Sequence, residues 1–355
     1  MNPAPNQPPP KASLSQLIGT GAIVLGPLVA VAVAVPLLWR RVLSPTDVVL
    51  GVVLYLVTGH GVTVGFHRMF THGSFRPNRG LKIALGVAGS MAVQGSLLSW
   101  VANHRRHHVH SDQAGDPHSP QPCGPSPTSA LRRFGHAHLG WLFRPDDTSA
   151  ARYAPDLLRD RDAVVLTRLF PLFAVASLVL PLVAGWLISG TWRGAVSAFV
   201  WAGLVRMALL HHVTWSINSV CHLAGRRPYT TSDRSGNVAS LALISMGESW
   251  HNLHHALPAS ARHGVGRWQF DSSARLIRLF ERLGWATKVR WPSPARLEAV
   301  RSHPSDGQLT AGRNSSAPDR ANKAVAMIAN IPMATSATPP LKASITAPAR
   351  STASA

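Results

Sequence analysis

Long apolar runs alternate along this chain with polar segments rich in arginine, histidine and proline. The apolar runs come as two pairs, each separated by a short polar turn. A helix rises about 1.5 Å per residue, so about 20 apolar residues are enough to cross the hydrocarbon core of a bilayer. The pattern therefore predicts an all-α integral membrane protein with four transmembrane helices in two hairpins, at about 14–38, 48–66, 166–188 and 195–213.

Other segments are less apolar or too short to span a membrane. Leu81 to Val101 is apolar but contains polar residues and several glycines, which favours one interfacial or partly buried helix. Phe270 to Leu283 has helical periodicity. Residues 1–13 are rich in proline, and 302–355 has too little apolar content to fold, so we expect both ends to be disordered. One membrane domain over 14–301, with a helical cap outside the membrane, lies between them.

The charge of the chain is strongly positive. The formal net charge is +20, although only 14% of the residues are charged and 46% are hydrophobic. The arginines do not gather on one amphipathic element, and no aromatic-rich nucleic-acid motif is present, so we exclude nucleic acid as a partner. With four spans, the N-terminus, 67–165 and the region after 213 share one side and carry most of the arginine. The positive-inside rule predicts that this side, with both termini, is the cytoplasmic side of the cell membrane. Arg40 and Arg41 lie on the opposite side and are the exception to this assignment.

Three histidine clusters lie just beyond apolar segments. They are HRMFTH at 67–72, HRRHH at 104–108 and HNLHH at 251–255, and His222 follows the last span. Neutral imidazole is the commonest nitrogen ligand for iron, zinc and copper, and residues three or four apart share one face of a helix. One such cluster alone is more often a solvated patch. Three clusters and His222 on one side of the membrane predict a metal centre in the cap.

The helices that carry these histidines can also be anticipated. His67 and His72, five residues apart, do not share a helical face, so we expect the second span to end or bend between them. Asn218 and His222 are four apart, which predicts one continuing helix, and His211 lies on the same face as a candidate to support a ligand.

The number of histidines indicates two metal ions, because eight or nine imidazoles exceed what one ion takes. Cys123 and Cys221 lack metal-binding spacing, so the ligands are nitrogens. Zinc does no redox chemistry, which favours iron in a di-iron centre over a hydrolytic site. Asp112, Asp116 and Glu248 lie beside the clusters and are either solvated surface acids or partners for the outer nitrogen of a ligand histidine.

As an ordered set, HRMFTH, HRRHH and GESWHNLHH between paired spans resemble the membrane fatty acid desaturases, most of all the acyl-CoA Δ9 (stearoyl-CoA) type. The similarity runs from about Leu50 to Pro292 and includes THGSF, SDQAGDPHSP, NSVCH and HHALP. The resemblance implies nine iron-binding histidines, with Asn218 reaching one iron through water: His67, His72, His104, His107, His108, His222, His251, His254 and His255. It also implies a kinked acyl tunnel lined by Gln94, Trp100, Thr214 and Trp215.

What the resemblance implies about the reaction is an O2-dependent removal of two hydrogens from a saturated fatty acyl-CoA, which leaves a cis double bond at Δ9. Two iron ions would be the cofactor and O2 the co-substrate. The sequence contains no haem-binding HPGG segment and no flavin fingerprint, so we expect electrons from a separate ferredoxin-like or flavoprotein oxidoreductase. Membrane lipid is the remaining partner.

One departure from the family concerns the acyl carrier. Animal members have Arg-Asp before the second cluster, where this chain has Ala102 and Asn103, and this puts the contact with a CoA headgroup in doubt. Arg105 and Arg106 are then either contacts for phosphate or charges at the membrane surface.

Two other functions fit part of the pattern. A hydroxylase or ketolase would use the same scaffold, because the same metal pair can add oxygen instead of removing a second hydrogen. A membrane metal-binding or transport protein needs polar ligands near mid-membrane. Here the clusters lie at the ends of the predicted spans, and only His60 lies well inside one. His60 and His212 are either polar core residues or cavity contacts. The remaining histidines are assigned no role: His110, His118, His136, His138, His263 and His303.

Overall fold

The protein is described here from a computed structural model that covers residues 13–38, 43–121, 129–144 and 148–302. The expectation of disordered ends concerns residues that lie almost wholly outside this part. Among the described residues, four helical segments are long and apolar enough to cross a membrane, which confirms the four predicted spans: Gln16–Val33, Pro45–Thr71, Phe170–Ser189 and Trp192–Ser219.

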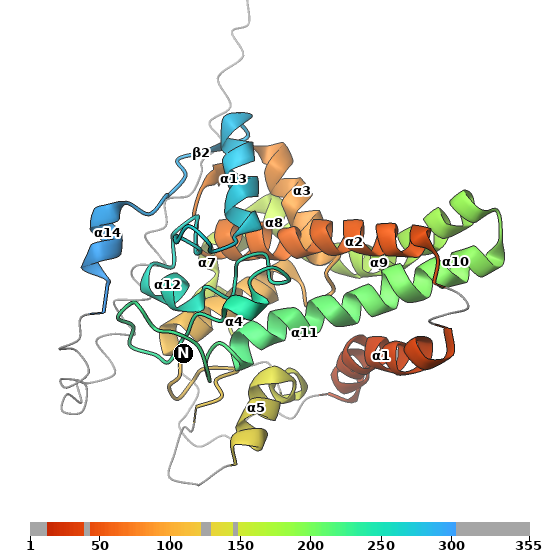
Figure 1. The fold of residues 1–355 in the computed structure, drawn as a ribbon, viewed down its shortest axis with the longest axis horizontal. Coiled ribbons are helices and arrows are strands. Elements are labelled where there is room, and N and C mark those ends of the chain that lie inside the picture. Colours follow the sequence, from red (N-terminus) through yellow and green to blue (C-terminus); the bar gives the residue numbers. More distant parts are fainter. Residues whose placement is uncertain (1–12, 39–42, 122–128, 145–147, 303–355) are drawn as a thin grey trace, which may run out of the picture.

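The long helices form one bundle (Figure 1). The first is α1 (Leu14–Leu38); the second is α2 (Pro45–His60), which continues into the wider π-helical turns of η1 (Gly61–Thr71). The third is α9 (Phe170–Ser189); the fourth joins α10 (Trp192–Ala198), η3 (Phe199–Val205) and α11 (Arg206–Ser219). Figure 1 shows α2, α9, α10 and α11 running side by side, and α1 packs against η3 and α11.

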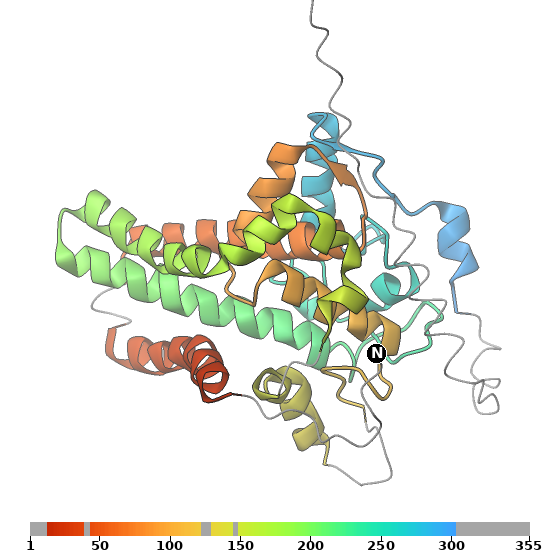
Figure 2. The same ribbon diagram turned by 180° about the vertical axis from the view of Figure 1, so that it is seen from behind.

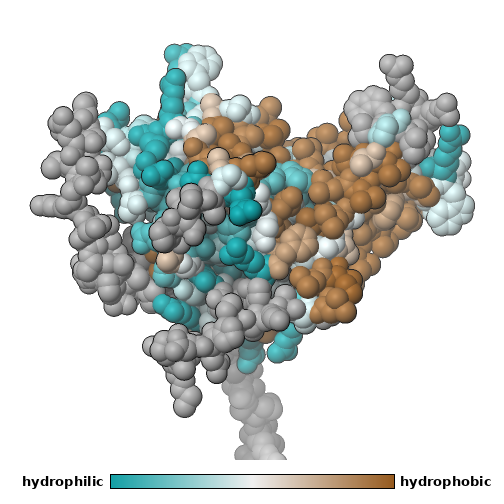
Figure 3. Space-filling view, turned by 90° about the horizontal axis from the view of Figure 1, so that it is seen from below, coloured by the Kyte–Doolittle hydropathy of each residue, from teal (hydrophilic) through white to brown (hydrophobic). Residues whose placement is uncertain are grey.

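Apolar side chains cover the part of the surface formed by these spans. Figure 3 shows them gathered towards one end of the molecule, while hydrophilic residues cover much of the other end. Val49 in α2, Leu172 in α9 and Leu209 in α11 are among the exposed apolar residues. A surface of this kind is compatible with lipid rather than water, so this half of the protein is the membrane-embedded half.

The segment expected to form one helix over 81–101 forms two, and that expectation is wrong. They are α3 (Arg79–Ser90), capped by Asn78, and α4 (Leu97–His110), which begins after Ser96. Between them Val93 has φ +57° and Gly95 has φ +109°, so the backbone is left-handed at two positions and cannot continue a right-handed helix. The break reorients α4, which then leads the second histidine cluster into the cap.

Short elements complete the cap, best seen from behind in Figure 2. They are α5 (Ala130–His138), η2 (Gly140–Phe143), α6 (Ala150–Tyr153), α7 (Pro155–Arg159), α8 (Arg161–Arg168), η4 (Ala239–Leu241), α12 (His251–Ala256), α13 (Ser272–Arg282) and α14 (Pro294–Ala299). β1 (Arg76–Pro77) pairs antiparallel with β2 (Ala286–Thr287). The helix predicted between Phe270 and Leu283 is confirmed as α13, which Asp271 caps.

Close packing between η1 and α3 depends on two glycines. A Cβ placed on Gly61 would overlap the backbone of Ala88 and Gly89, and one on Gly89 would overlap the ring of Phe66. The two backbones therefore approach more closely than any larger residue would permit, and this contact lies one to two turns before His67.

We predict that Gly61→Ala destabilises the fold by about 1–3 kcal/mol, because overpacking forces η1 away from α3. Gly51→Ala is the matched control, since a Cβ there meets Ala202 at an ordinary 3.7 Å. Thermal denaturation in detergent, followed by size-exclusion chromatography, should show a lower midpoint for Gly61→Ala only. Equal midpoints for the two variants would contradict the packing argument.

Candidate metal centre and adjoining cavity

Four elements bring the histidines together. His67 lies in η1 and His72 follows directly after η1 ends at Thr71, so the expectation that the span ends between them is confirmed. The second cluster is on α4 and the third on α12. His222 lies beyond α11, which ends at Ser219, so the expectation of one helix through Asn218 and His222 is wrong. The chain turns there, and the turn directs His222 towards α12.

The nine histidines form two groups in which every ligand-type atom lies within 4.8 Å of the others. We name them the five-histidine group (His67, His72, His104, His108 and His254) and the four-histidine group (His107, His222, His251 and His255). α4 and α12 each contribute to both groups. On α4 and on α12, the two histidines four apart belong to one group and the histidine between them belongs to the other.

Within the groups, nitrogens approach one another closely. Nε2 of His254 lies 3.0 Å from Nε2 of His67 and 2.9 Å from that of His108. Nε2 of His251 lies 3.1 Å from that of His222 and 3.0 Å from that of His255. Two imidazole nitrogens bound at right angles to one ion at about 2.1 Å lie about 3.0 Å apart. The spacing fits a metal ion in each group.

Carboxylates hold the outer nitrogens of four of these rings. Glu248 lies 2.6 Å from Nδ1 of His67, and Asp116 lies 2.9 Å from Nδ1 of His107. Asp112 lies 3.0 Å from Nδ1 of His222, and Asp233 lies 2.5 Å from Nδ1 of His255. The first three acids can be recognised in the sequence because they adjoin the clusters. Asp233 cannot, because it lies in a loop with no cluster beside it.

The protonation states of these histidines and acids favour the binding of a cation. Burial lowers the pKa of several rings well below the usual histidine value and so keeps them neutral: His72, His104, His108, His251 and His254. Burial would raise the pKa of the acids, but the imidazoles lower it, and Arg68 does so too for Glu248. The acids are therefore ionised.

These states give a direct test of whether metal fits. A ring that donates its Nδ1 proton to a carboxylate has a lone pair on Nε2, and His222 and His255 both direct that lone pair at His251. Nε2 of His72 and of His107 is buried with no hydrogen-bond partner in the described residues. Converging lone pairs repel unless a cation lies between them, so the residues fit a pair of transition-metal ions.

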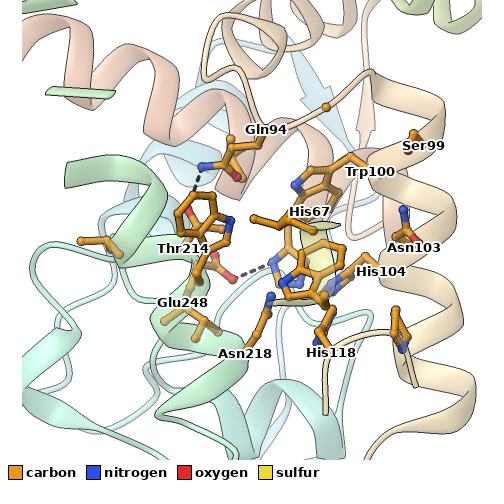
Figure 4. A pocket seen from close by; sticks show the side chains of 18 of the residues that line it. His67, Gln94, Ser99, Trp100, Asn103, His104, His118, Thr214, Asn218 and Glu248 are labelled. Atoms are coloured by element: carbon orange, nitrogen blue, oxygen red, sulfur yellow. Dashed lines mark hydrogen bonds and ion pairs between the residues drawn. The ribbon is translucent and has the colours of Figure 1, made fainter. Parts of the chain in front are cut away.

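A cavity of 590 Å³ adjoins both groups. Its lining includes His67 and His104 of one group, His251 of the other, and Asn218. The four expected acyl-tunnel residues Gln94, Trp100, Thr214 and Trp215 all line it. Figure 4 shows Nε2 of Gln94 bonded to the hydroxyl of Thr214, at 2.9 Å. The Trp100 ring stacks on the His104 ring at 5.1 Å.

The lining of the cavity is of two kinds. Val62, Leu210 and Val213 are apolar and belong to the spans, whereas Asn103, Arg106 and Arg144 are polar and belong to the cap. Thr20, Ile23 and Val24 of α1 also contribute to the wall. A lining that combines apolar and charged side chains is compatible with an apolar chain that has a polar headgroup.

Two histidines left without a role by sequence analysis lie beside the groups. Nδ1 of His263 is 3.5 Å from Glu248, and its ring lies 4.6 Å from that of His254. The ring of His118 lies 4.4 Å from that of His107 and lines the cavity. Only the loops that follow the clusters bring them there, so residue spacing carried no signal.

Other expected roles are not what the structure shows. Arg105 is 1% exposed, pairs with Asp156 at 2.5 Å and donates to the carbonyls of Phe70 and Thr71. It therefore anchors the end of η1, and the expectation of a phosphate or membrane-surface contact is wrong for it. Arg106 lines the cavity and donates to Gly115 O and to the Thr148 hydroxyl.

The remaining histidines of the described chain lie outside the two groups. Nε2 of His211 bonds to the carbonyl of Ala92, so it supports the turn between α3 and α4 instead of a ligand. His60 bonds to the carbonyl of Leu56 and to the hydroxyl of Ser272. His212 bonds to His138 at 2.9 Å. His303 lies outside the described residues.

Comparison with known proteins gives concordant matches. Residues 44–285 match the family model described as fatty acid desaturase. The chain is 37% identical to a hex-5-enoyl-[acyl-carrier protein] acetylenase of Moorena producens (strain JHB), over 77% of this chain and 86% of that protein. It is 36% identical to an sn-1 stearoyl-lipid 9-desaturase of Anabaena variabilis, over 67% of this chain and 81% of that protein. It is 37% identical to an acyl-CoA C20 Delta5-desaturase of Anemone leveillei, over 68% of this chain and 72% of that protein.

We predict that protein purified from iron-supplemented cells holds about two iron ions per chain, one per group. His254→Ala, in the five-histidine group, and His222→Ala, in the four-histidine group, should each lower this to about one or less, because each removes a ligand. His136→Gln is the control, since His136 lies in neither group. Elemental analysis by mass spectrometry measures the ratio. Unchanged iron in both alanine variants would contradict the assignment.

Proposed function

This chain belongs to the fatty acid desaturase family, and we propose that it is an O2-dependent acyl desaturase that introduces a cis double bond into a saturated fatty acyl chain. Membership of the family makes it an oxidoreductase that acts on fatty acyl chains. The observation that carries the finer proposal is the position of both histidine groups on the wall of one partly apolar cavity. A saturated chain lying in that cavity passes beside the metal centre.

In this proposal nine histidines hold two iron ions, five around one and four around the other, and Asn218 reaches one of the two ions through water. When bound, the iron pair supplies with O2 the oxidising power that removal of hydrogen from an unactivated methylene requires. The carboxylates keep Nδ1 protonated on the four rings that they contact and leave Nε2 of those rings free to bind. Figure 4 shows Asn218 extending towards the region between His67 and His104.

The cavity selects which methylenes react. Neighbouring CH2 groups are chemically alike, so their position beside the metal decides where the double bond forms. Trp100 packs on His104, and the bond between Gln94 and Thr214 ties the turn after α3 to α11. In this proposal these contacts hold the cavity wall rigid on both sides of the fatty acyl chain. We propose position Δ9, in line with the motifs and with the name of the Anabaena variabilis relative.

For the carrier we propose CoA. Arg106 and Arg144 line the cavity, and guanidinium groups bind phosphates well. The named relatives act on acyl-carrier protein, lipid and CoA substrates, so the carrier varies within the family. We further propose that the protein lies in the cell membrane with both termini in the cytoplasm, where a ferredoxin-like or flavoprotein donor supplies the electrons.

A second candidate follows from one comparison. The Moorena producens relative is an acetylenase whose named substrate already has a double bond, and it shares 37% identity with this chain. The same metal centre could act on an unsaturated chain, and a hydroxylase or ketolase would also share this scaffold. These alternatives differ in product, so one analysis of cellular lipids separates them.

We predict that cells expressing this chain accumulate a cis-monounsaturated fatty acid with the double bond at Δ9, because the cavity presents one pair of methylenes to the metal centre. Gas chromatography and mass spectrometry of derivatised fatty acids give the bond position. The product should require O2 and should disappear in a variant carrying both His107→Ala and His254→Ala, while His136→Gln retains it.

Other products would change the assignment. A hydroxy or keto acid would support the hydroxylase or ketolase, and a triple bond the acetylenase. No lipid change, in cells shown to contain an active ferredoxin and its reductase, would contradict the proposal and favour metal binding or transport. Purified enzyme given acyl-CoA and phospholipid in parallel identifies the carrier.

A further inference from the structure

The four-histidine group is surrounded by uncompensated negative charge. Three of its four rings donate to a carboxylate: His107 to Asp116, His222 to Asp112 and His255 to Asp233, at 2.9, 3.0 and 2.5 Å. The side chains of these acids are at most 5% exposed. Within the described residues none of the three forms an ion pair with lysine or arginine. Three full negative charges therefore lie one imidazole away from the metal position.

The five-histidine group lacks this charge. Among its rings only His67 contacts a carboxylate, that of Glu248. In the described part of the chain the other four rings make no hydrogen bond or ion pair with an acid: His72, His104, His108 and His254. Most of the ligands at this position are thus neutral rings with no anion behind them.

Arginine compensates the one acid that is present. Arg68 is 1% exposed, and its Nη2 lies 2.9 Å from Oε1 of Glu248 and 3.0 Å from Oδ1 of Asp271. Asp271 also accepts from the backbone amides of Ala274 and His263. The guanidinium is shared between Glu248 and Asp271, so it offsets part of the charge of Glu248 before that charge acts on a metal bound to His67.

From this asymmetry, and resting on the di-iron function proposed above, we propose that the two metal positions are unequal: the four-histidine group binds its ion first and releases it last. A divalent cation is attracted by each carboxylate through the intervening imidazole, and in a buried site water screens this attraction little. Outer partners of this kind are each worth about 10–100-fold in metal affinity.

The number of ligands acts in the opposite direction, since the other group has one more imidazole. That fifth ring is neutral and takes the place of a water molecule on the ion. Against it stand two additional carboxylates, together with the absence of a buried arginine on the four-histidine side in the described residues. Charge therefore outweighs ligand number, and we expect at least a tenfold difference in release rate.

The experiment is anaerobic loading of the full-length chain in detergent with Fe²⁺, followed by addition of a chromogenic ferrous chelator. We expect about two ions per chain that leave in two phases, the slower at least tenfold slower. His72→Ala, in the five-histidine group, should keep only the slow phase. His222→Ala, in the four-histidine group, should keep only the fast phase.

Substitution of the acids tests the cause. Asp112→Asn and Asp233→Asn should each accelerate the slow phase about 10–100-fold and leave the fast phase unchanged. Asp162→Asn is the matched control, because Asp162 pairs with Arg79 at 2.9 Å, away from both groups, and should change neither phase. Size-exclusion profiles of all variants show whether each remains folded. Because two acids are substituted separately, the proposal can still be tested if one of the two variants fails to fold.

The outcomes separate this inference from the function on which it rests. A single release phase, a slow phase that disappears in His72→Ala, or acid variants that behave as the wild type would each overturn the inequality while leaving the di-iron function intact. A wild-type chain that holds no iron pair would overturn both. Ordered release from a chain that forms no altered fatty acid would contradict the desaturase function alone.

Discussion

Imidazole nitrogens that approach one another within about 3 Å impose the condition on which the rest of this structure depends. Lone pairs at that separation repel, and burial removes the water that would otherwise screen them. The scaffold holds them there with carboxylates on the outer nitrogens of four rings and with helices that fix the backbone positions. A bound cation would convert this repulsion into coordination, which would couple metal binding to folding of the cap.

The membrane-embedded half supports this arrangement mechanically. η1 is both the end of a span and the carrier of His67, and Gly61 lets it pack directly on α3. Arg105 ties the last turn of η1 to Asp156 in the cap, so the position of His72 does not depend on its loop alone. A cavity whose wall belongs to the same elements as the histidines would keep the proposed substrate and metal ions in fixed relation.

Sequence predicted the spans well because a bilayer demands a long apolar helix, and composition alone reveals one. The clusters were also readable, since a spacing of three and four residues marks one helical face. The break at Val93 and the turn before His222 were not, because each depends on local backbone angles that tertiary contacts decide. Asp233, His118 and His263 reach the site through loops, and loops carry no periodicity from which a contact can be read.

Because α4 and α12 each carry histidines of both groups, the geometry of each helix fixes the spacing between the groups. On each, two rings one turn apart serve one group and the ring between them serves the other. The offset between the two histidine groups along each helix is therefore set by helical pitch, about 1.5 Å and 100° per residue, and not by loop length. A residue inserted between these histidines would rotate those on one side of it by about 100° relative to those on the other, whereas residues inserted in the connecting loops would leave this offset unchanged.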